Sequence, residues 1–468
     1  MRVLLVSTYD LGRQPFGLAL PAAWLRNAGV EVDCADTSRE TLSDQRIASA
    51  GLVAFYLPMH TATRLASPLI DRVRRVNPTA RLAAYGLYAP INQGWLRDKG
   101  IGHVLGPEGE EELRELAMGS DPGDAATQPR ESRRHRGLTP QRAGLLPLAN
   151  YARLQMPDGS TRIVGSTDAT RGCKHLCRHC PIVPVYKGRF HAIPADAVLA
   201  DIRQQVVAGA QHVSFGDPDF LNGPTHAHRI VERLAVEFPG LTYDATIKIE
   251  HILKHASLLP VLARTGCLFI TSAAESVDDD VLRHLAKGHT RADFVAAVHL
   301  CREIGIALAP TFVAFTPWTT LDGYRQLLET LEELELIEQV APIQLAIRLL
   351  ITNSSPLLDL PDIQAVIAEF DPASLTWPWR HSDSRVDALQ QQVMGRVGIN
   401  PRASRAELFE AIRGLSEGTA FGGAATHASD AGCESRRHLT LSPQPAIPIL
   451  SENWYCCAEP SAEDLRLV

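Results

Sequence analysis

Three cysteines stand close together in the stretch RGCKHLCRHCP (Arg171–Pro181). Cys173, Cys177 and Cys180 follow a C-x3-C-x2-C spacing, and the next cysteine, Cys267, comes far downstream. Thiolates are soft ligands, which suit an iron–sulfur cluster or zinc and do not suit magnesium or calcium. Three thiolates on one short loop can hold three irons of a [4Fe–4S] cluster and leave the fourth iron open to a substrate or cofactor.

Two other interpretations of the three cysteines stay open from their spacing alone. His175 or His179 could complete a zinc site, or the cysteines could be grouped by chance. Zinc ribbons usually carry two ligand pairs a dozen or more residues apart, and the cysteine that follows this group is much more distant. The spacing therefore favours an iron–sulfur cluster over zinc.

The segments that must position this loop alternate short apolar runs with helical patterns, from about Tyr151 to beyond residue 350. After a first strand just before the cysteines, we expect strands at 212–217, 243–249, 267–275, 306–315 and 342–350. We expect helices at 196–209, 226–238, 256–266, 291–305 and 322–336. Six strands with helices between them predict an open or closed α/β barrel, whose chemistry belongs at the carboxyl ends of the strands.

The cysteine loop and three later segments resemble the radical S-adenosylmethionine (SAM) enzymes, and the resemblance covers most of residues 165–355. The similar segments are FGDPDF (Phe215–Phe220), TSAAESVDDDVLRHLAKGHT (Thr271–Thr290) and LLITNSSPLL (Leu349–Leu358). The resemblance implies a partial (β/α)6 barrel in which Cys173, Cys177 and Cys180 ligate the cluster. It also implies that SAM chelates the fourth iron and is cleaved reductively to a carbon radical.

The same resemblance implies positions for SAM. The backbone at Gly216 and Asp217 would receive its amino group, although this chain departs from the commoner Gly-Gly-Glu form. Glu275 would lie near the ribose hydroxyls, and His179 would stand beside adenine. Taken as isolated residues, Asp217 could cap the helix that starts after Pro224, and Glu275 could begin an acidic helix.

The first 117 residues predict a doubly wound parallel sheet, from strand-like runs at 2–7, 30–36, 52–58, 80–86 and 103–109 and a helix at 21–29. This part resembles the cobalamin-binding domain that precedes many radical SAM barrels. The Asp-x-His-x-x-Gly loop that supplies a cobalt ligand is replaced by YDLGRQPFG (Tyr9–Gly17), which has no histidine. His60 follows the third strand and is expected to cap a helix or line a pocket. Cobalamin without a protein ligand and an empty, repurposed domain are both consistent with this pattern.

A second group of thiols lies near the end of the chain, in ENWYCCAEP (Glu452–Pro460). The ending CCAEP resembles the CUAEP/CCAEP-tail radical SAM proteins, which are similar to the radical SAM enzymes of arsinothricin biosynthesis. The leading hypothesis is that Cys456 and Cys457, with Cys433, present trivalent arsenic. The cluster-bound SAM would then supply its 3-amino-3-carboxypropyl group.

Three alternatives stand beside this hypothesis. The chain could be a 5'-deoxyadenosyl-radical or cobalamin-dependent enzyme that modifies or methylates a small metabolite, with the tail pair as a redox relay. It could be an arsenic- or redox-sensing binding protein. The adjacent cysteines could also be an idle exposed pair, although exposed free thiols are a liability. The expected partners are a small-molecule substrate and an electron donor such as flavodoxin or ferredoxin.

Composition limits the class of protein. The chain has 468 residues, a formal net charge of -7 and nine cysteines. The charge gives no argument for nucleic-acid or anionic membrane binding, and no apolar run of about 18 residues is present to span a bilayer. The cysteine usage predicts a reducing cytoplasm, with Cys34, Cys267 and Cys301 as small core residues.

The expected organisation has five parts. A polar stretch, Met118–Gly144, is interpreted as a linker or mobile loop because it combines glycine, proline and arginine without a period. One amphipathic helix is expected at Ala406–Leu415. The parts are a cobalamin-binding-like α/β domain (1–117), a linker (118–150), a radical SAM barrel (151–358), a helical extension (359–430) and a cysteine-containing tail (431–468).

Overall fold

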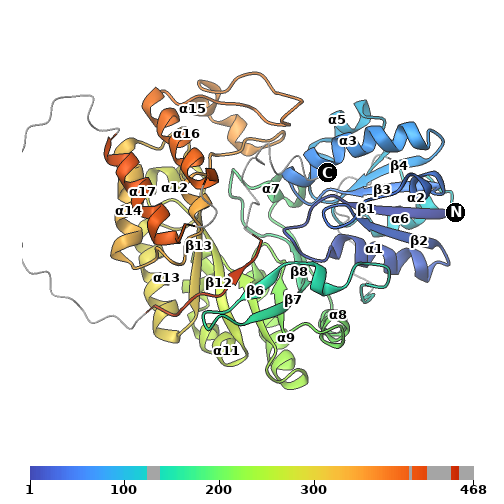
Figure 1. The fold of residues 1–468 in the computed structure, drawn as a ribbon, viewed down its shortest axis with the longest axis horizontal. Helices are drawn as coiled ribbons and strands as arrows, with labels where there is room; N and C mark the ends of the chain where they lie inside the picture. The colour runs from blue at the N-terminus through green and yellow to red at the C-terminus, as the bar shows by residue number, and fades with distance from the viewer. Residues whose placement is uncertain (124–136, 400–402, 419–443, 453–468) are drawn as a thin grey trace, which may run out of the picture.

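The computed structural model describes residues 1–123, 137–399, 403–418 and 444–452, which form two β-sheets side by side with helices around them (Figure 1). The first sheet has the parallel order β2-β1-β3-β4-β5. Its strands are β1 (Arg2–Ser7), β2 (Glu31–Asp36), β3 (Leu52–Tyr56), β4 (Arg81–Tyr85) and β5 (His103–Val104). Its helices are α1 (Phe16–Asn27), α2 (Asp44–Ala48), α3 (His60–Val76), α4 (Tyr88–Ile91), α5 (Gln93–Asp98) and α6 (Glu110–Ala117).

Both faces of this first sheet are buried. In β1, Val3 and Leu5 pack into the core made with α1 and α6, whereas Leu4 and Val6 pack into the core made with α3. Successive side chains of a strand point to opposite faces, so a strand covered on both sides must be apolar throughout. The expected doubly wound, Rossmann-like domain is confirmed.

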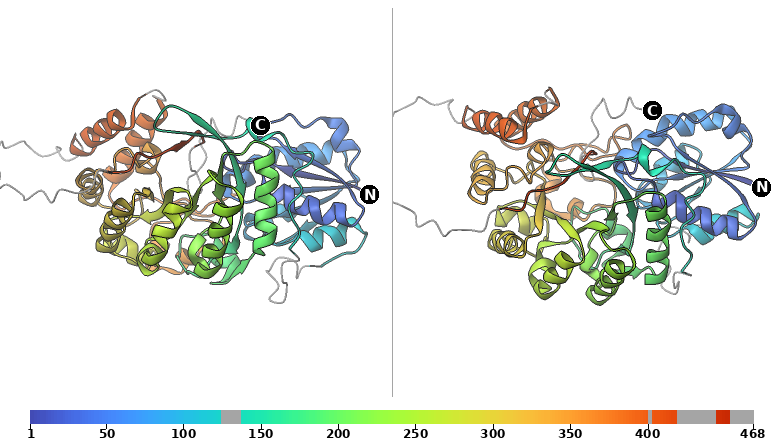
Figure 2. Two further views of the ribbon diagram at one scale, coloured as in Figure 1. Left: turned by 90° about the horizontal axis from the view of Figure 1, so that it is seen from below. Right: turned by 60° about the horizontal axis from the view of Figure 1, so that its bottom comes forward.

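The second sheet has the order β13-β12-β11-β10-β7-β6-β14 and curls into a half-barrel (Figures 1 and 2). Five strands are parallel: β7 (Thr161–Thr167), β10 (His212–Phe215), β11 (Thr242–Thr246), β12 (Cys267–Glu275) and β13 (Ala307–Phe312). Two antiparallel strands, β6 (Arg153–Gln155) and β14 (Ile449–Leu450), extend its edge. A small separate hairpin is formed by β8 (Thr170–Gly172) and β9 (Phe190–Ala192).

Helices alternate with these strands as the sequence predicts. They are α7 (Ile182–Tyr186), α8 (Ala195–Val207), α9 (Pro224–Glu237), α10 (Ile249–Lys254), α11 (Leu259–Arg264), α12 (Asp279–His284), α13 (Arg291–Ile304), α14 (Leu321–Glu333), α15 (Pro361–Gln364), α16 (Ser384–Ile399) and α17 (Arg405–Gly418). Local signals explain the bounds of α13. Thr290 and Asp293 form a capping box at its start, and Gly305, with a φ of 82°, ends it.

The expected sixth strand at 342–350 is wrong as an extended element. Pro342–Leu345 forms a 3-10 turn, and only a bridge between Phe315 and Arg348 continues the sheet. Pro342 has no N–H to donate to a ladder. The Gln344 side chain accepts a hydrogen bond from Phe312 N at 3.1 Å, so a side chain satisfies the donor that a longer strand would have paired.

The expected helix at 21–29 begins five residues earlier, at Phe16, and contains Pro21. A proline inside a helix removes the hydrogen bond to the carbonyl four residues before it, here that of Gly17. The Tyr85 hydroxyl donates to this carbonyl at 2.7 Å, which replaces the lost bond.

Residues 137–144, expected in a linker or mobile loop, are hydrogen-bonded to both domains: Gln141 N donates to the Ala19 carbonyl, and the Gln204 side chain donates to the Pro140 carbonyl, each at 2.9 Å. The Arg142 guanidinium donates to both oxygens of Asp201 at 2.8 Å, and also to Gln14 Oε1 at 2.7 Å. The side chains of Arg142 and Asp201 are 8% and 0% exposed. Sequence periodicity cannot reveal such an anchor, because a single buried ion pair has no repeating pattern. Residues 124–136 lie outside the described part.

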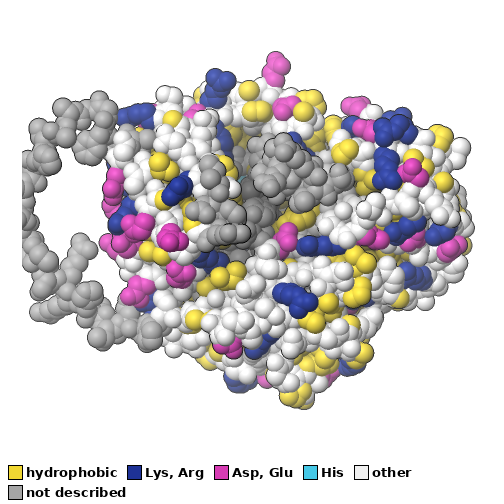
Figure 3. Space-filling model, in the orientation of Figure 1, with side chains coloured by type: hydrophobic (Ala, Val, Ile, Leu, Met, Phe, Trp, Pro, Cys, Tyr) yellow, Lys and Arg dark blue, Asp and Glu magenta, His cyan; other side chains and the backbone are white. Residues whose placement is uncertain are grey.

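Among the described residues, no helix is long and apolar enough to cross a membrane. On the face shown in Figure 3, lysine and arginine side chains are interspersed with aspartate and glutamate. This surface therefore offers no single-signed field that would attract a polyanion.

Arg142→Ala should lower the free energy of unfolding by about 3–5 kcal/mol, because Asp201 would be left as a buried carboxylate without its partner. Urea unfolding followed by circular dichroism measures the change. Arg203→Ala is the matched control. Its ion pair with Glu237 lies at the surface, with 56% of the Arg203 side chain exposed, and should cost less than about 1 kcal/mol. Equal losses in the two variants would contradict the anchoring role.

Candidate functional site

A cavity of about 320 Å³ lies between the two sheets, and Figure 3 shows the surface hollowed where the two parts meet. Its wall combines the ends of β1, β3 and β4 with the carboxyl ends of β10, β11, β12 and β13. Carboxyl ends of parallel strands leave a crevice between the loops that follow them, which is where α/β proteins bind ligands. The volume falls within the range of small-molecule pockets.

All three cysteines of the C-x3-C-x2-C loop line this cavity, as do His179, Gly216, Asp217 and Glu275. Cys173 and Cys177 are buried, and Cys180 is half-buried. Burial raises the pKa of Cys173 to about 11, so this thiol would not ionise near neutral pH without a cation to stabilise the thiolate. The structure thus gathers every predicted site residue that lies within its described part.

The turn into the cysteine loop needs glycine at position 172. Gly172 has a φ of 80°, and a Cβ there would clash with the Tyr186 ring and lie 2.6 Å from the Arg189 carbonyl oxygen. Only glycine adopts this conformation without steric cost. The backbone therefore bends sharply just before Cys173.

Two buried lysines that the sequence analysis did not single out complete the wall beside the cysteines. Lys248 Nζ lies 3.6 Å from Cys177 Sγ and donates to the Lys287 carbonyl at 3.0 Å. Lys287 Nζ lies 3.4 Å from Glu275 Oε1. Lys248 follows β11 and Lys287 follows α12, both at the carboxyl side of the sheet. This position in the barrel is the one sequence signal that could have identified the two lysines.

These lysines allow a test of whether the residues fit an anionic metal cluster. Buried charges are costly unless they are paired. Lys287 pairs with Glu275, and Lys248 lies 3.8 Å from the partly exposed carboxylate of Glu250 and 3.6 Å from Cys177 Sγ. Ionised thiolates on a cluster would add negative charge directly beside these two lysines, so the donor set fits a [4Fe–4S] cluster.

The alternative of a zinc site completed by a nearby histidine is not favoured by the geometry. His179 Nε2 points to Glu275 Oε1 at 3.0 Å. His175 faces Asp219 and Glu250, at 3.5 and 3.4 Å. Because both histidines have other partners, the three cysteines keep an open fourth position.

Glu275 occupies a strained position at the end of β12. Its φ is 67°, in the left-handed region that non-glycine residues rarely adopt, and the register with β13 shifts there. Burial opposes ionisation, but the charges of Lys287 and His179 outweigh it and hold the pKa of Glu275 at about 2. The result is a permanently ionised acceptor in the cavity wall, suited to hydroxyl groups.

Asp217 does not cap the helix after Pro224, since the residue at the start of α9 is Gly223. Its carboxylate accepts hydrogen bonds from Ala169 N at 2.9 Å and Thr170 Oγ1 at 2.6 Å. Burial, helped by the neighbouring charge of Asp168, raises the pKa of Asp217 to about 7. The Asp217 side chain therefore holds the segment that leads into the cysteine loop. The backbone of Asp217 remains at the cavity wall.

Arg171, just before the cysteines, ties them to the first domain. Its guanidinium pairs with Glu110 at 2.6 Å, and both side chains are buried. It also lies over the Phe16 ring, 5.4 Å from the centroid. The sequence analysis did not identify this pair, because its members are 61 residues apart.

The remaining cysteines and His60 have simpler places. Cys34, Cys267 and Cys301 are buried in the core, as expected. Cys433, Cys456 and Cys457 lie outside the described residues. His60 is buried in the first turn of α3 and its Nε2 lies 2.7 Å from the Ser374 carbonyl oxygen; burial lowers its pKa to about 4.

Residues 168–319 match the model of the Radical SAM superfamily. The chain is 26% identical over 194 residues to a tRNA-2-methylthio-N(6)-dimethylallyladenosine synthase of Desulfosudis oleivorans, covering 38% of this chain and 40% of that protein. It is 29% identical over 149 residues to a bacteriochlorophyllide d C-12(1)-methyltransferase of Chlorobaculum tepidum, covering 31% and 32% of the two chains. The chain thus matches about two fifths or less of the length of these relatives.

Two solved structures share the fold. The cobalamin-dependent SAM radical enzyme OxsB superposes with a TM-score of 0.65 at 13% identity, over 90% of this chain and 72% of the other. The radical SAM methyltransferase TsrM of Kitasatospora setae gives 0.58 at 18% identity, over 71% of each. The chain therefore contains a radical SAM domain, and its two-domain fold is like that of cobalamin-dependent radical SAM enzymes. The radical SAM family uses a [4Fe–4S] cluster and SAM.

Replacing any one of Cys173, Cys177 or Cys180 by serine should lower the iron bound after anaerobic reconstitution from about 4 per chain to below about 1. A hard hydroxyl is a poor substitute for a soft thiolate. Iron and sulfide analysis measures the loss. Cys301→Ala is the matched control, because that thiol is buried in α13 away from the cavity, and it should keep its iron. Serine variants with wild-type iron content would contradict the assignment.

Proposed function

We propose that this chain is a radical SAM enzyme that transfers the 3-amino-3-carboxypropyl group of SAM to thiol-bound trivalent arsenic. In the overall reaction a carbon–sulfur bond of SAM breaks and a carbon–arsenic bond forms, with 5'-methylthioadenosine as the second product. The observation that carries the proposal is the attachment of the chain just before the tail thiols to the rim of the cavity.

The cavity residues supply the SAM side of this reaction. Cys173, Cys177 and Cys180 would hold the cluster, which supplies the electron for SAM cleavage when it is reduced by a donor such as flavodoxin or ferredoxin. Ionised Glu275, oriented by His179, would accept hydrogen bonds from the ribose hydroxyls. The backbone at Gly216 is open to the SAM amino group.

Glu452 fastens the chain beside the cavity. Its carboxylate accepts from the Tyr9 hydroxyl at 3.1 Å and pairs with Arg39 at 3.1 Å. Gly12, with a φ of 68°, lies against it, and a Cβ at that position would come within 2.7 Å of Glu452 Cβ. The preceding strand β14 pairs with β6. The described segment 444–452 is therefore held in place by β14 and by Glu452.

Glu452, which precedes Cys456 and Cys457 in the sequence, lies beside residues that line the cavity. Leu11 and Arg13, on either side of Gly12, line the cavity. Cys456 is four residues beyond Glu452, and four residues span at most about 14 Å. Trivalent arsenic is a soft centre that thiolates chelate, and a chelated arsenic near the SAM carbon would replace a bimolecular encounter by a positioned one.

A second candidate is cobalamin-dependent methylation of a small metabolite, which the fold similarity to OxsB and TsrM favours. No histidine of the first domain (residues 1–117) lines the cavity, so this domain offers no imidazole ligand for cobalt there. The loop after β1 carries Asp10 and no histidine, and Tyr56 and Tyr85, with ring centroids 5.4 Å apart, stand at the ends of β3 and β4. His60 faces the Ser374 carbonyl and does not line the cavity. We therefore rank arsenic alkylation first.

The test is an anaerobic reaction of the reconstituted full chain with SAM and a reductant, with and without arsenite, analysed by mass spectrometry. We expect 5'-methylthioadenosine together with an arsenic-bearing amino acid only when arsenite is present. A methylated product that requires added cobalamin would support the second candidate. Formation of 5'-deoxyadenosine irrespective of arsenite would contradict arsenic alkylation.

The role of the tail pair is tested in the same assay. The double variant Cys456→Ser/Cys457→Ser should lose at least about 100-fold in arsenic product, because the bound orientation is lost. It should retain its iron and its SAM binding. Cys301→Ala controls for the removal of a thiol as such. Undiminished arsenic turnover in the double variant would show that the pair does not present the substrate.

A further inference from the structure

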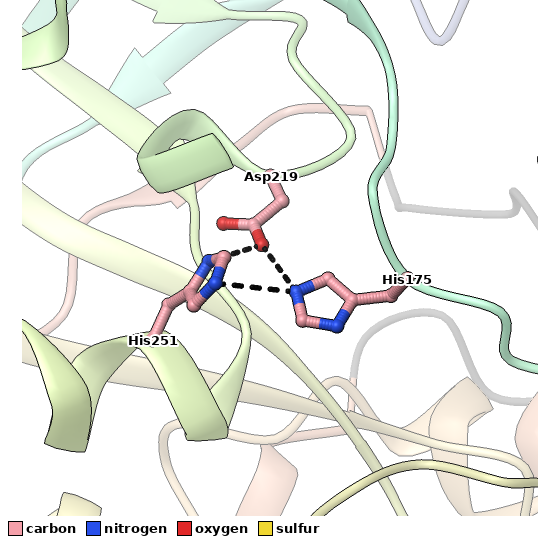
Figure 4. A group of neighbouring side chains, drawn as sticks. All are labelled: His175, Asp219 and His251. Atoms are coloured by element: carbon pink, nitrogen blue, oxygen red, sulfur yellow. Dashed lines mark hydrogen bonds and ion pairs between the residues drawn. The ribbon is translucent and has the colours of Figure 1, made fainter. Parts of the chain in front are cut away.

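Behind the cysteine loop, and outside the cavity described above, three side chains of the metal-ligating type meet: His175, Asp219 and His251 (Figure 4). They come from three separate places in the sequence: the cysteine loop, the segment after β10, and α10. We propose that these residues form a second metal site, which binds a divalent first-row transition ion such as zinc or iron(II).

The ligand atoms are close enough together for one ion. One potential ligand atom from each residue lies within 4.8 Å of the others. His175 Nε2 is 3.5 Å from Asp219 Oδ2 and 3.3 Å from His251 Nε2. Ligands about 2.0–2.2 Å from a common ion stand roughly 3 Å apart, so small side-chain rotations would suffice.

The polar atoms of this group are poorly satisfied without an ion. Asp219 and His251 are fully buried, and the His175 side chain is 13% exposed. Asp219 Oδ2 lies 2.6 Å from His251 Nδ1 and 3.5 Å from His175 Nε2, but the angles at Oδ2 and Nδ1 are poor for hydrogen bonds. Buried polar atoms are usually well paired, and an ion bound between these side chains would satisfy them better than the bent contacts do.

The surroundings are those of a metal site. Asp219 Oδ1 accepts a hydrogen bond from Leu221 N at 3.2 Å, which fixes the carboxylate and leaves Oδ2 directed at the histidines. His175 Nδ1 lies 3.4 Å from Glu250 Oε2. A histidine that binds metal through one ring nitrogen usually donates its other N–H to a carboxylate, which orients the ring.

Two imidazoles and one carboxylate favour zinc or iron(II) over calcium or magnesium, which prefer oxygen ligands alone. Three protein ligands leave at least one coordination position for water. Because His175 stands between Cys173 and Cys177, an ion here would fasten the cysteine loop to the strand-end segment and to α10. The site would therefore position the cluster loop through residues that do not line the cavity.

The test is metal analysis of the full chain in a Cys433→Ser/Cys456→Ser/Cys457→Ser background, which removes the tail thiols as competing ligands. The protein is reconstituted with iron and sulfide, exposed to zinc, desalted and analysed for both metals. We expect about 1 zinc, or about 1 iron beyond the 4 of the cluster, per chain. Asp219→Asn, which keeps the side-chain shape, should lower this extra metal to below about 0.2 per chain.

Three further variants separate this site from the cluster and from misfolding. Cys173→Ala/Cys177→Ala/Cys180→Ala should lose the cluster iron and keep the extra metal. His255→Gln is the matched control for His251→Gln. The His255 ring lies beside His251, with centroids 5.3 Å apart, but is not among the three ligands, so only His251→Gln should lose the metal.

Cobalt(II) gives an independent reading. Bound at this site in the cluster-free protein, it should show d–d absorption without the intense sulfur-to-cobalt bands of thiolate ligation. Absence of extra metal in the parent protein, or its retention in folded Asp219→Asn, would overturn the proposal and leave a proton-sharing His–Asp–His network.

Discussion

The site depends on one constraint: the charges of two buried lysines must be balanced where water is excluded. Lys248 and Lys287 are buried at the carboxyl end of the barrel, with 7% and 3% of their surface exposed. Glu275 pairs with Lys287, and the partly exposed Glu250 lies 3.8 Å from Lys248; the cysteine sulfurs are the other neighbouring groups that can carry negative charge. A buried ammonium without a partner would cost several kcal/mol. The lysines therefore favour ionised thiolates, the form in which cysteine binds metal.

The same logic joins the two domains. Arg171 and Glu110 form a buried pair directly before the cysteine loop, and Arg142 forms another with Asp201 while also donating to Gln14 of the first domain. Removing one partner of a buried ion pair costs more free energy than replacing both partners by apolar residues, because the remaining charge is left buried and unpaired. The two pairs therefore give the interface a defined geometry. The cavity between the sheets is thus enclosed by rigid walls, and the segment ending at Glu452 adds a third element at its rim.

The general fold could be predicted from the sequence because it rests on periodic patterns. Apolar strands alternating with amphipathic helices gave both α/β domains, and the cysteine spacing with FGDPDF indicated which strand ends carry the site. Long-range pairing could not be predicted. The Arg171–Glu110 pair has no periodic sequence pattern that could predict it. Where a sixth strand was expected, the Gln344 side chain instead accepts the hydrogen bond of Phe312 N.

The chemical roles of individual site residues were harder to predict than the positions of these residues in the fold. Asp217 and Glu275 both line the cavity, but their pKa values are shifted in opposite directions. Burial, helped by Asp168, raises the pKa of Asp217, whereas Lys287 and His179 outweigh burial and lower the pKa of Glu275. His175 was considered as a zinc ligand together with the cysteines. The structure instead places it with Asp219 and His251, on the other side of the loop.

The central claim is that a three-cysteine cluster in the inter-domain cavity binds SAM at its open iron, with Glu275 holding the ribose. The most direct measurement is electron paramagnetic resonance of the reduced, reconstituted protein with and without SAM. The account predicts a [4Fe–4S] signal whose g values shift when SAM is added, and a shift that needs at least about 10-fold more SAM in Glu275→Gln. A wild-type signal that is identical with and without SAM would contradict it.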